Sequence, residues 1–275
     1  MRPLLERWEE VEPHLREAQR LLLLTDFDGT LAPMVRDPEK ARLPPSRLRL
    51  LDTLRQKPGV ALGIISGRTL ADLKKRVPLE GVYYAGNHGL EIEGPDLKFR
   101  HPEAEAARPD LERIREELTL RLWDIPGVFL EDKGFGLSFH LRRVPKTLRP
   151  KAEALFDEVI EPFLKAGRVR VNGGKLIWEV RPPVAWDKGD ALAVIRDAVK
   201  KEGGEPLVIY LGDDSSDEAA FRKLSDEDLP IFVGEPRAPT FRFAQGSASA
   251  RYFLRNLKEV DESFRRLLRA SVPCG

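Results

Sequence analysis

The sequence predicts an α/β fold in which a doubly wound, mainly parallel sheet carries a smaller inserted α+β domain. Two observations lead to this prediction. Four short, continuous apolar runs alternate with amphipathic helical segments, which is the pattern of βα units. Between the second and third runs, residues 105–182 read instead as a helix, two strands, a helix and two strands. We therefore expect a core of residues 1–104 and 183–275 around an inserted domain of residues 105–182.

The first elements are a packing helix and a buried strand. Residues 4–19 place apolar side chains at helical spacing, and LLLLT at 21–25 is the first apolar run. Three similar runs follow, VALGIIS, PLVIYLG and PIFVG, and the helical segments are SRLRLLDTLRQ, TLADLKKRV and GDALAVIRDAVKKE. Such runs are typical of strands buried on both faces of a parallel sheet. In these folds ligands bind beyond the carboxyl ends of the strands, so the site should lie there.

The inserted segment repeats one unit, a helix followed by a pair of strands. The helices are ARPDLERIREELTLRLW and TLRPKAEALFDEVIEPFL, and the strand pairs are GVFLEDKG with GLSFHLRR and VRVNGG with KLIWEVRP. Glycines join the strands of each pair, which favours antiparallel hairpins. One face of the resulting sheet should be apolar and covered by the helices, because its side chains alternate between apolar and polar.

Composition excludes several classes of function. Lys and Arg total 46 against 45 for Asp and Glu, a net charge of +1 that gives no broad surface for nucleic acid or membrane. The only cysteine, Cys274, excludes an internal disulfide framework and a cysteine metal cluster. The LLLL run is too short to span a bilayer, and acidic residues precede it, unlike in a secretion signal. We expect a cytoplasmic monomer that acts on a small molecule.

Two carboxylates follow the first buried strand directly. Asp26 and Asp28 would have a high desolvation cost there without a positive partner, and hard oxygen ligands suit Mg²⁺. Gly29 lets the chain turn sharply away from the strand end. The sequence thus predicts a bound cation at the tip of this strand, with a solvated turn as the alternative.

The ends of two other strands carry complementary groups. Ser66 ends the second run, and Gly67 and the start of the next helix would offer backbone N–H groups to a phosphate, although an ordinary helix cap is the alternative. The third run ends in LGDDSSDE, where crowded carboxylates require a metal or a lysine. Lys188, in AWDKGDAL, can supply that charge, although an exposed lysine is the simpler interpretation.

Together these four elements resemble, in order, the four motifs of the haloacid dehalogenase (HAD) phosphatase superfamily. The resemblance implies that Asp26 is the nucleophile and that Asp28 is the general acid and base. Ser66 would hold a phosphoryl oxygen, and Lys188 would neutralise Asp26 and the transferring group. The implied ligands of Mg²⁺ are Asp26, Asp28 through its carbonyl, and Asp213, supported by Asp214 and Asp217. Substrate-binding candidates beside these motifs are Thr30, Gly67 and Arg68.

The inserted domain resembles the cap domains that choose substrates in this superfamily. Its polar sheet face bears candidate contacts for a hydroxyl-rich substrate, Glu131, Lys133, His140, Arg142, Lys175 and Glu179; a solvent-facing sheet surface is the alternative. The resemblance is more specific in five passages, which are similar to the trehalose-6-phosphate phosphatase family: AGNHGLEI, LEDKGFGLSFHLR, NGGKLIWEVRP, WDKGDAL and LGDDSSDEAAF. That resemblance implies Mg²⁺-dependent hydrolysis of trehalose 6-phosphate, with disaccharide contacts from the cap, and it makes His88 a further substrate-binding candidate.

Other functions remain open at this point. A phosphatase for sucrose, mannosylglycerate or glucosylglycerol phosphate would need only different cap contacts. A phosphomutase would return the phosphoryl group to a sugar instead of water. A non-catalytic sugar-phosphate sensor is disfavoured, because a sensor need not keep Asp26, Asp28, Lys188 and Asp213 together.

Overall fold

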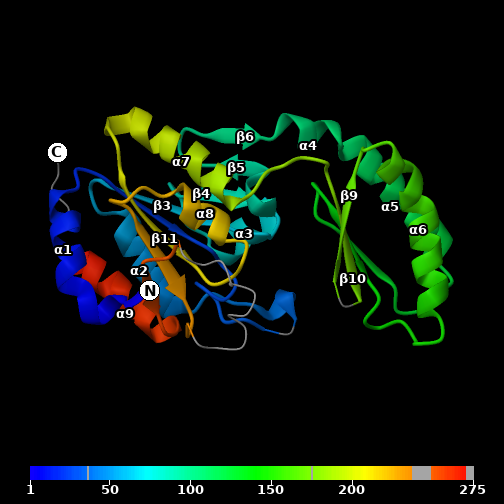
Figure 1. The fold of residues 1–275 in the computed structure, drawn as a ribbon, viewed down its shortest axis with the longest axis horizontal. Coiled ribbons are helices and arrows are strands. Elements are labelled where there is room, and N and C mark those ends of the chain that lie inside the picture. The colour runs from blue at the N-terminus through cyan, green and yellow to red at the C-terminus, as the bar shows by residue number, and fades with distance from the viewer. Residues whose placement is uncertain (36, 175, 237–248, 271–275) are drawn as a thin grey trace. The chain divides into compact units, whose positions relative to one another are not determined.

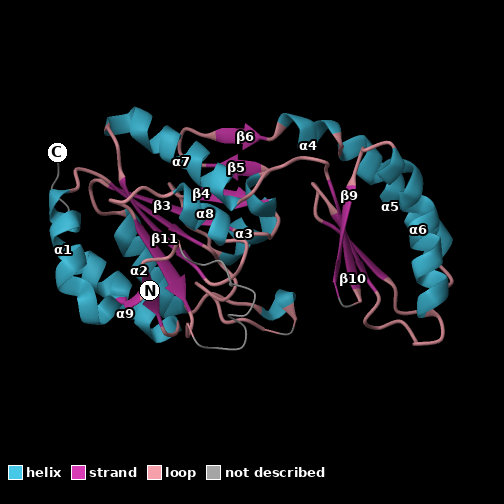
Figure 2. Ribbon diagram, in the orientation of Figure 1, coloured by secondary structure: helices cyan, strands magenta, loops and turns pink. Residues whose placement is uncertain are grey.

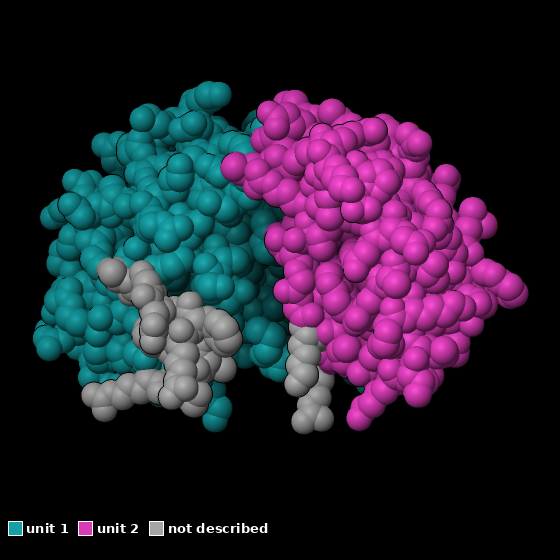
Figure 3. Space-filling view, turned by 45° about the vertical axis from the view of Figure 1, so that its right-hand side comes forward, with its two compact units in different colours: residues 1–99, 186–275 teal, residues 100–185 magenta. Residues whose placement is uncertain are grey.

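A computed structural model of the chain describes residues 1–35, 37–174, 176–236 and 249–270. The chain divides into two compact units, residues 1–99 with 186–275, and residues 100–185, which Figure 3 colours separately. The second unit thus begins a few residues before the expected insertion, because it includes the short helix α4 (Pro102–Ala106).

The first unit is built on a nine-stranded sheet (Figures 1 and 2). Its strands, in spatial order, are β1 (Arg2–Pro3), β13 (Tyr252–Leu254), β12 (Leu229–Val233), β11 (Leu207–Gly212), β2 (Leu21–Thr25), β3 (Val60–Ile65), β4 (Tyr83–Gly86), β5 (Glu91–Glu93) and β6 (Lys98–Arg100). In this spatial order, neighbouring strands pair in parallel from β1 through β13, β12, β11, β2 and β3 to β4, and β5 pairs antiparallel to β4. The predicted doubly wound sheet is confirmed.

Helices cover both faces of this sheet. The α-helices of the unit are α1 (Trp8–Glu17), α2 (Pro45–Arg55), α3 (Leu70–Arg76), α7 (Lys188–Gly203), α8 (Glu218–Lys223) and α9 (Leu257–Arg269), and the 3₁₀ helices are η1 (Leu4–Arg7), η2 (Pro38–Lys40) and η3 (Asn87–Gly89). Side chains of α1, α2, α3 and α9 share one apolar cluster with the strands. Those of α7 and α8 share the cluster on the opposite face. The sheet is therefore the middle of three layers.

Strand β2 lies at the centre of the sheet, between β11 and β3. Its side chains alternate, so Leu21 and Leu23 join the first cluster while Leu22 and Leu24 join the second. All four leucines are fully buried. This explains the continuous apolar run, and it fixes the end of β2 rigidly where Asp26 follows.

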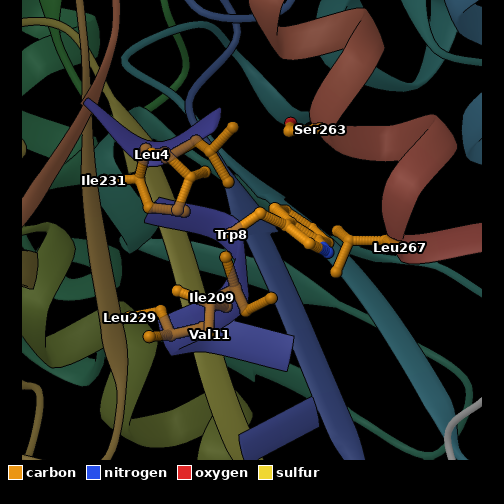
Figure 4. A pocket seen from close by; sticks show the side chains of 9 residues that line it. Leu4, Trp8, Val11, Ile209, Leu229, Ile231, Ser263 and Leu267 are labelled. Carbon is orange, nitrogen blue, oxygen red and sulfur yellow. The ribbon is translucent and has the colours of Figure 1, made fainter. Parts of the chain in front are cut away.

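The N-terminal segment packs onto the strands on the far side of the sheet from α7. Figure 4 shows Leu4, Trp8 and Val11 converging with strand residues Ile209 and Ile231. A small apolar pocket remains between them, and Ser263 and Leu267 of α9 also line it. The expected N-terminal packing helix is confirmed, although its first turn is a 3₁₀ helix.

The second unit packs two helices against one face of a four-stranded sheet. The helices are α5 (Arg108–Leu122) and α6 (Arg149–Lys165), and the strands are β7 (Phe129–Asp132), β8 (Leu137–His140), β10 (Ile177–Arg181) and β9 (Arg170–Gly174), in spatial order. All three strand pairings are antiparallel. Phe139 stacks on Phe156 of α6 at a centroid distance of 4.7 Å within this unit's own apolar cluster. The predicted pair of hairpins is confirmed.

The helices of the described residues are too short or too polar to cross a membrane.

Candidate active site

The carboxyl ends of β2, β3 and β11 bring the acidic and basic groups of the first unit together. The three strands pair in parallel, so the residues that follow them emerge at the same edge of the sheet. Asp26 continues this pairing, because its backbone N–H donates to the carbonyl of Leu211 at 2.8 Å. Gly29 has a φ of +91° and lies against the Asp213 side chain, where a Cβ would overlap the carboxylate. The close turn after β2 therefore requires glycine.

Lys188 is the cation of this edge. Its ammonium group donates to Asp26 Oδ1 and to Asp217 Oδ1, each at 2.7 Å, and only 2% of its side chain is exposed. Burial alone would lower the pKa of Lys188, but the charges of Asp217 and Asp26 outweigh it and raise that pKa. Lys188 is therefore positively charged at neutral pH.

The position of Lys188 is set by the start of α7. Asp187 caps this helix: its carboxylate accepts from the N–H groups of Gly189 and Asp190, and the Asp190 side chain accepts from the N–H of Asp187. Lys188 is thus the first residue of a helix whose end is fixed by a reciprocal capping box.

Asp217 has its hydrogen-bonding capacity already in use. One carboxylate oxygen accepts from Lys188 and from the Tyr210 hydroxyl at 2.7 Å, and the other accepts from the N–H groups of Asp213 and Asp214 at 3.0 and 3.1 Å. Its side chain is fully buried. Asp217 is therefore placed to orient the loop after β11 rather than to offer a free oxygen.

Asp26, Asp213 and Asp217 each bring one carboxylate oxygen within 4.8 Å of the others. Burial raises the pKa of Asp213 to about 7, helped by the charges of Asp217 and Asp214. Burial likewise raises the pKa of Asp26 well above its usual range, although Lys188 acts in the opposite direction. These carboxylates have more negative charge than Lys188 can balance, and oxygen donors are what Mg²⁺ prefers, so Asp26 and Asp213 fit a divalent cation beside the already bonded Asp217.

The residues predicted to form the metal site do not all bring their side chains to the acidic cluster. Asp26 and Asp213 belong to this cluster. The Thr30 hydroxyl donates to Asp213 Oδ1 at 3.2 Å. Asp214 accepts from Ser216, whose hydroxyl lies 2.6 Å from Oδ1. The carboxylate of Asp28 is outside the cluster and faces Arg68, with Nε–Oδ2 and Nη2–Oδ1 distances of 2.6 and 2.7 Å.

Ser66, Gly67 and His88 lie side by side at the end of β3. The His88 N–H donates to the Ser66 carbonyl at 2.9 Å, and a Cβ on Gly67 would come within 2.8 Å of the His88 ring. Asn87 and His88 have φ values of 51° and 58°, a left-handed backbone that is costly outside glycine. Two of the N–H groups at the start of α3 are already used, because Leu70 N–H donates to Glu91 at 3.3 Å and Asp72 N–H donates to Thr69 at 3.1 Å.

Charged side chains pair on the open face of the second unit's sheet. His140 Nε2 lies 3.1 Å from Glu131 Oε2, and Lys133 donates to Glu179 at 3.2 Å. Burial would raise the pKa of Glu179, but Lys133 and the paired Arg181 lower it. The structure thus brings Glu131, Lys133, His140 and Glu179 onto one polar patch.

Arg142 and Lys175 are the two remaining predicted contacts of the second unit. Arg142 lies beyond the end of β8 with an exposed side chain. Lys175 lies outside the described residues.

Three residues of the site were not anticipated. Tyr210 bonds Asp217 from inside a buried strand, where an aromatic residue gives no sign of a polar role. Asp72 and Arg76 extend the contacts of Arg68, and their spacing of four residues along a helix was the available signal.

The chain is similar to known proteins of one family. A family model described as trehalose-phosphatase matches residues 24–257. A trehalose-phosphate phosphatase of Mycobacterium tuberculosis is 38% identical over 218 residues, which are 78% of this chain and 54% of that protein. The chain therefore spans about half the length of the curated relatives it matches.

Solved structures are similar over almost the whole chain. The C-terminal domain of a C. albicans trehalose-6-phosphate phosphatase has 26% identity and a TM-score of 0.70, covering 98% of this chain and 99% of that one. A trehalose-6-phosphate phosphatase of Aspergillus fumigatus has 28% identity and a TM-score of 0.63, covering 98% and 100%. The resemblance inferred from the motifs is confirmed, and the chain belongs to the trehalose-phosphatase family, with the HAD fold.

Proposed function

We propose that this chain hydrolyses trehalose 6-phosphate to trehalose and inorganic phosphate. The observation that carries the proposal is the buried bridge of Lys188 between Asp26 and Asp217, beside Asp213, at the carboxyl edge of the sheet. The family and the names of its relatives support the choice of substrate.

In the proposed first step, Asp26 attacks phosphorus. Lys188 engages Asp26 Oδ1, so Oδ2 would form the new bond to phosphorus while the bond to the sugar oxygen breaks. Asp28 would give its proton to the departing sugar oxygen, which becomes a hydroxyl, a contribution on the order of 10² to 10⁴ in rate. Ser66 and the backbone at Gly67 would hold the oxygens of the phosphoryl group.

In the proposed second step, water releases the phosphoryl group from Asp26. Asp28, now ionised, would take a proton from the water as its oxygen bonds to phosphorus, and the bond to Asp26 would break to give phosphate. Asp26 and Asp213, with the carbonyl of Asp28, would hold Mg²⁺, and Asp214 and Asp217 would orient them. When bound, Mg²⁺ supplies positive charge that lets a carboxylate approach a phosphate dianion.

Substrate choice is assigned to the second unit. Glu131, Lys133, His140 and Glu179 form a patch of charged donors and acceptors that matches the hydroxyls of a disaccharide. Arg142, Lys175 and His88 remain predicted substrate contacts, as do Thr30 and Arg68. A cytoplasmic monomer without macromolecular partners remains the prediction for the whole protein.

The experiment is Mg²⁺-dependent phosphate release from trehalose 6-phosphate, sucrose 6-phosphate and glucose 6-phosphate, with Asp26→Asn as the control. We expect release mainly from trehalose 6-phosphate and none above background from the variant. Preference for another sugar phosphate would retain the chemistry and reject the substrate. No phosphate release from any of the three sugar phosphates would favour a sugar-phosphate sensor instead.

A further inference from the structure

Arg68 ties the Asp28 carboxylate to two other parts of the first unit. Besides its two bonds to Asp28, it donates from Nη1 to Asp72 at 2.8 Å and from Nη2 to the Pro38 carbonyl at 2.8 Å. Its guanidinium carbon also lies 5.3 Å from the centre of the Phe27 ring. The side chain is 11% exposed. Arg68 is therefore held from several directions, and it holds both oxygens of Asp28 in a planar, bidentate geometry.

Asp72 holds Arg68 in turn. Asp72 Oδ2 accepts from Arg68 and also from Arg76 Nε at 2.7 Å. Burial would raise the pKa of Asp72, but Arg76 and Arg68 lower it, so the carboxylate stays ionised between two cations. Arg76 donates further to the Ala41 carbonyl. The chain of contacts thus runs from Asp28 through Arg68 and Asp72 to Arg76, and it fastens the segment 38–41 at both ends.

This geometry bears on acid catalysis because a proton donor must point at the leaving oxygen. A free carboxylate on a turn has several side-chain rotamers, whereas a bidentate guanidinium selects one plane. The Arg68 guanidinium bonds both Asp72 and Asp28, so Asp72 acts on Asp28 through Arg68. An arginine that instead bound substrate phosphate would matter equally for every phosphate ester.

We propose that Arg68 and Asp72 are positioning residues that orient the carboxylate of Asp28 for proton transfer to the sugar oxygen. The inference rests on the proposed function, and it adds to it a role for Asp72 and a different role for Arg68. It makes a distinctive demand: loss of the pair should harm esters with a poor leaving group and spare esters whose leaving group departs unprotonated.

The test compares kcat/KM for trehalose 6-phosphate and for p-nitrophenyl phosphate in the full chain with Mg²⁺. This ratio includes only steps up to the first irreversible one, so water attack does not enter it. For Asp72→Asn we expect a loss of about tenfold to 100-fold with the sugar phosphate and less than about threefold with the aryl phosphate. Asp28→Asn should show the same selectivity more strongly, and Asp72→Glu should recover part of the loss.

Lys74→Gln is the matched control. Lys74 is on the same helix and pairs with Glu93 at 2.6 Å, on a partly exposed surface. Lys74→Gln should leave kcat/KM unchanged for both substrates. An equal loss of kcat/KM for both substrates in Asp72→Asn, or no loss for either, would overturn the proposal.

A crystal structure of Asp72→Asn keeps the two proposals separable. If the wild type cleaves none of the sugar phosphates, the proposed function fails, and the structure alone decides about positioning. If the wild type cleaves the sugar phosphate but not p-nitrophenyl phosphate, the crystal structure again decides about positioning. A rotated or doubly occupied Asp28 side chain supports the inference, whereas an Asp28 unchanged from the wild-type protein overturns it.

Discussion

At the residue scale, the crowded carboxylates make the metal-free protein sensitive to pH. Burial and the neighbouring carboxylates raise the pKa of Asp213 from 3.8 to about 7. A carboxyl group with a raised pKa binds more protons in the folded state than in the unfolded state. Its favourable contribution is therefore present at low pH and is lost as the pH rises from about 4 through about 7.

This gives a prediction for thermal unfolding without metal. In EDTA, the melting temperature should fall between about pH 5 and about pH 8, and added Mg²⁺ should restore it because a cation bound only to the folded state stabilises it. Asp213→Asn should flatten the pH dependence without metal and should weaken the effect of Mg²⁺. Differential scanning fluorimetry across this pH range measures both, and a melting temperature that rises with pH in EDTA would contradict the assignment.

Residues with a strong local pattern were the ones that the sequence could identify. Asp26 and Asp213 directly follow buried strands and Lys188 begins α7, so their positions follow from the pattern of the chain. Tyr210 could not be identified, because its bond to Asp217 depends on which side of β11 the loop folds back. For Arg68, the sequence suggested a substrate contact, whereas its bonds to Asp28 depend on the packing of two strand ends.

At the scale of elements, the N-terminus of α7 positions the ammonium group of Lys188. The Asp187 capping box orients the first turn, and Lys188 is its first residue. Asp187→Ala should cost about 1 kcal/mol of stability, as for other N-cap residues. A displacement of a catalytic group by about 1 Å can reduce the rate about 100-fold. If loss of the cap displaces the Lys188 ammonium group, we expect kcat for the sugar phosphate to fall by about tenfold to 100-fold as well.

The α9 helix offers a matched control for that prediction. Asn256 caps α9 by accepting from the N–H groups of Lys258 and Glu259, away from the acidic cluster. Asn256→Ala should lose similar stability, about 1 kcal/mol, with turnover unchanged. Urea unfolding and phosphate release on both variants check this, and equal turnover in the two would reject the positioning role of the cap.

Elements buried on both faces were predictable, and short edge elements were not. The runs that became β2, β3, β11 and β12 read as strands because they are short, continuous and mainly apolar. β5 and β6 have three residues each and contain charged side chains, so no periodicity distinguished them from loops. β1 has two residues and exists through its pairing with β13, a contact of about 250 positions along the chain that a local pattern cannot contain.

At the scale of the whole molecule, the two units have separate apolar cores. The cluster of the second unit draws its members from residues 111–180, and the two clusters of the first unit draw theirs from the chain on either side. A domain with its own core can fold alone. We therefore predict that residues 100–185, expressed as a fragment, unfold cooperatively in urea with native-like circular dichroism.

Phe139→Ala makes this prediction specific to the core of the second unit. Phe139 is fully buried, stacks on Phe156 and contacts Trp178, so its removal should cost the fragment about 3–5 kcal/mol. In the full chain, the same change should shift one unfolding transition and leave the other near its wild-type position, because the first unit's clusters contain no residue of this core. A single transition that moves as a whole would mean that the two units unfold as one, and that recognition and chemistry share one cooperative structure.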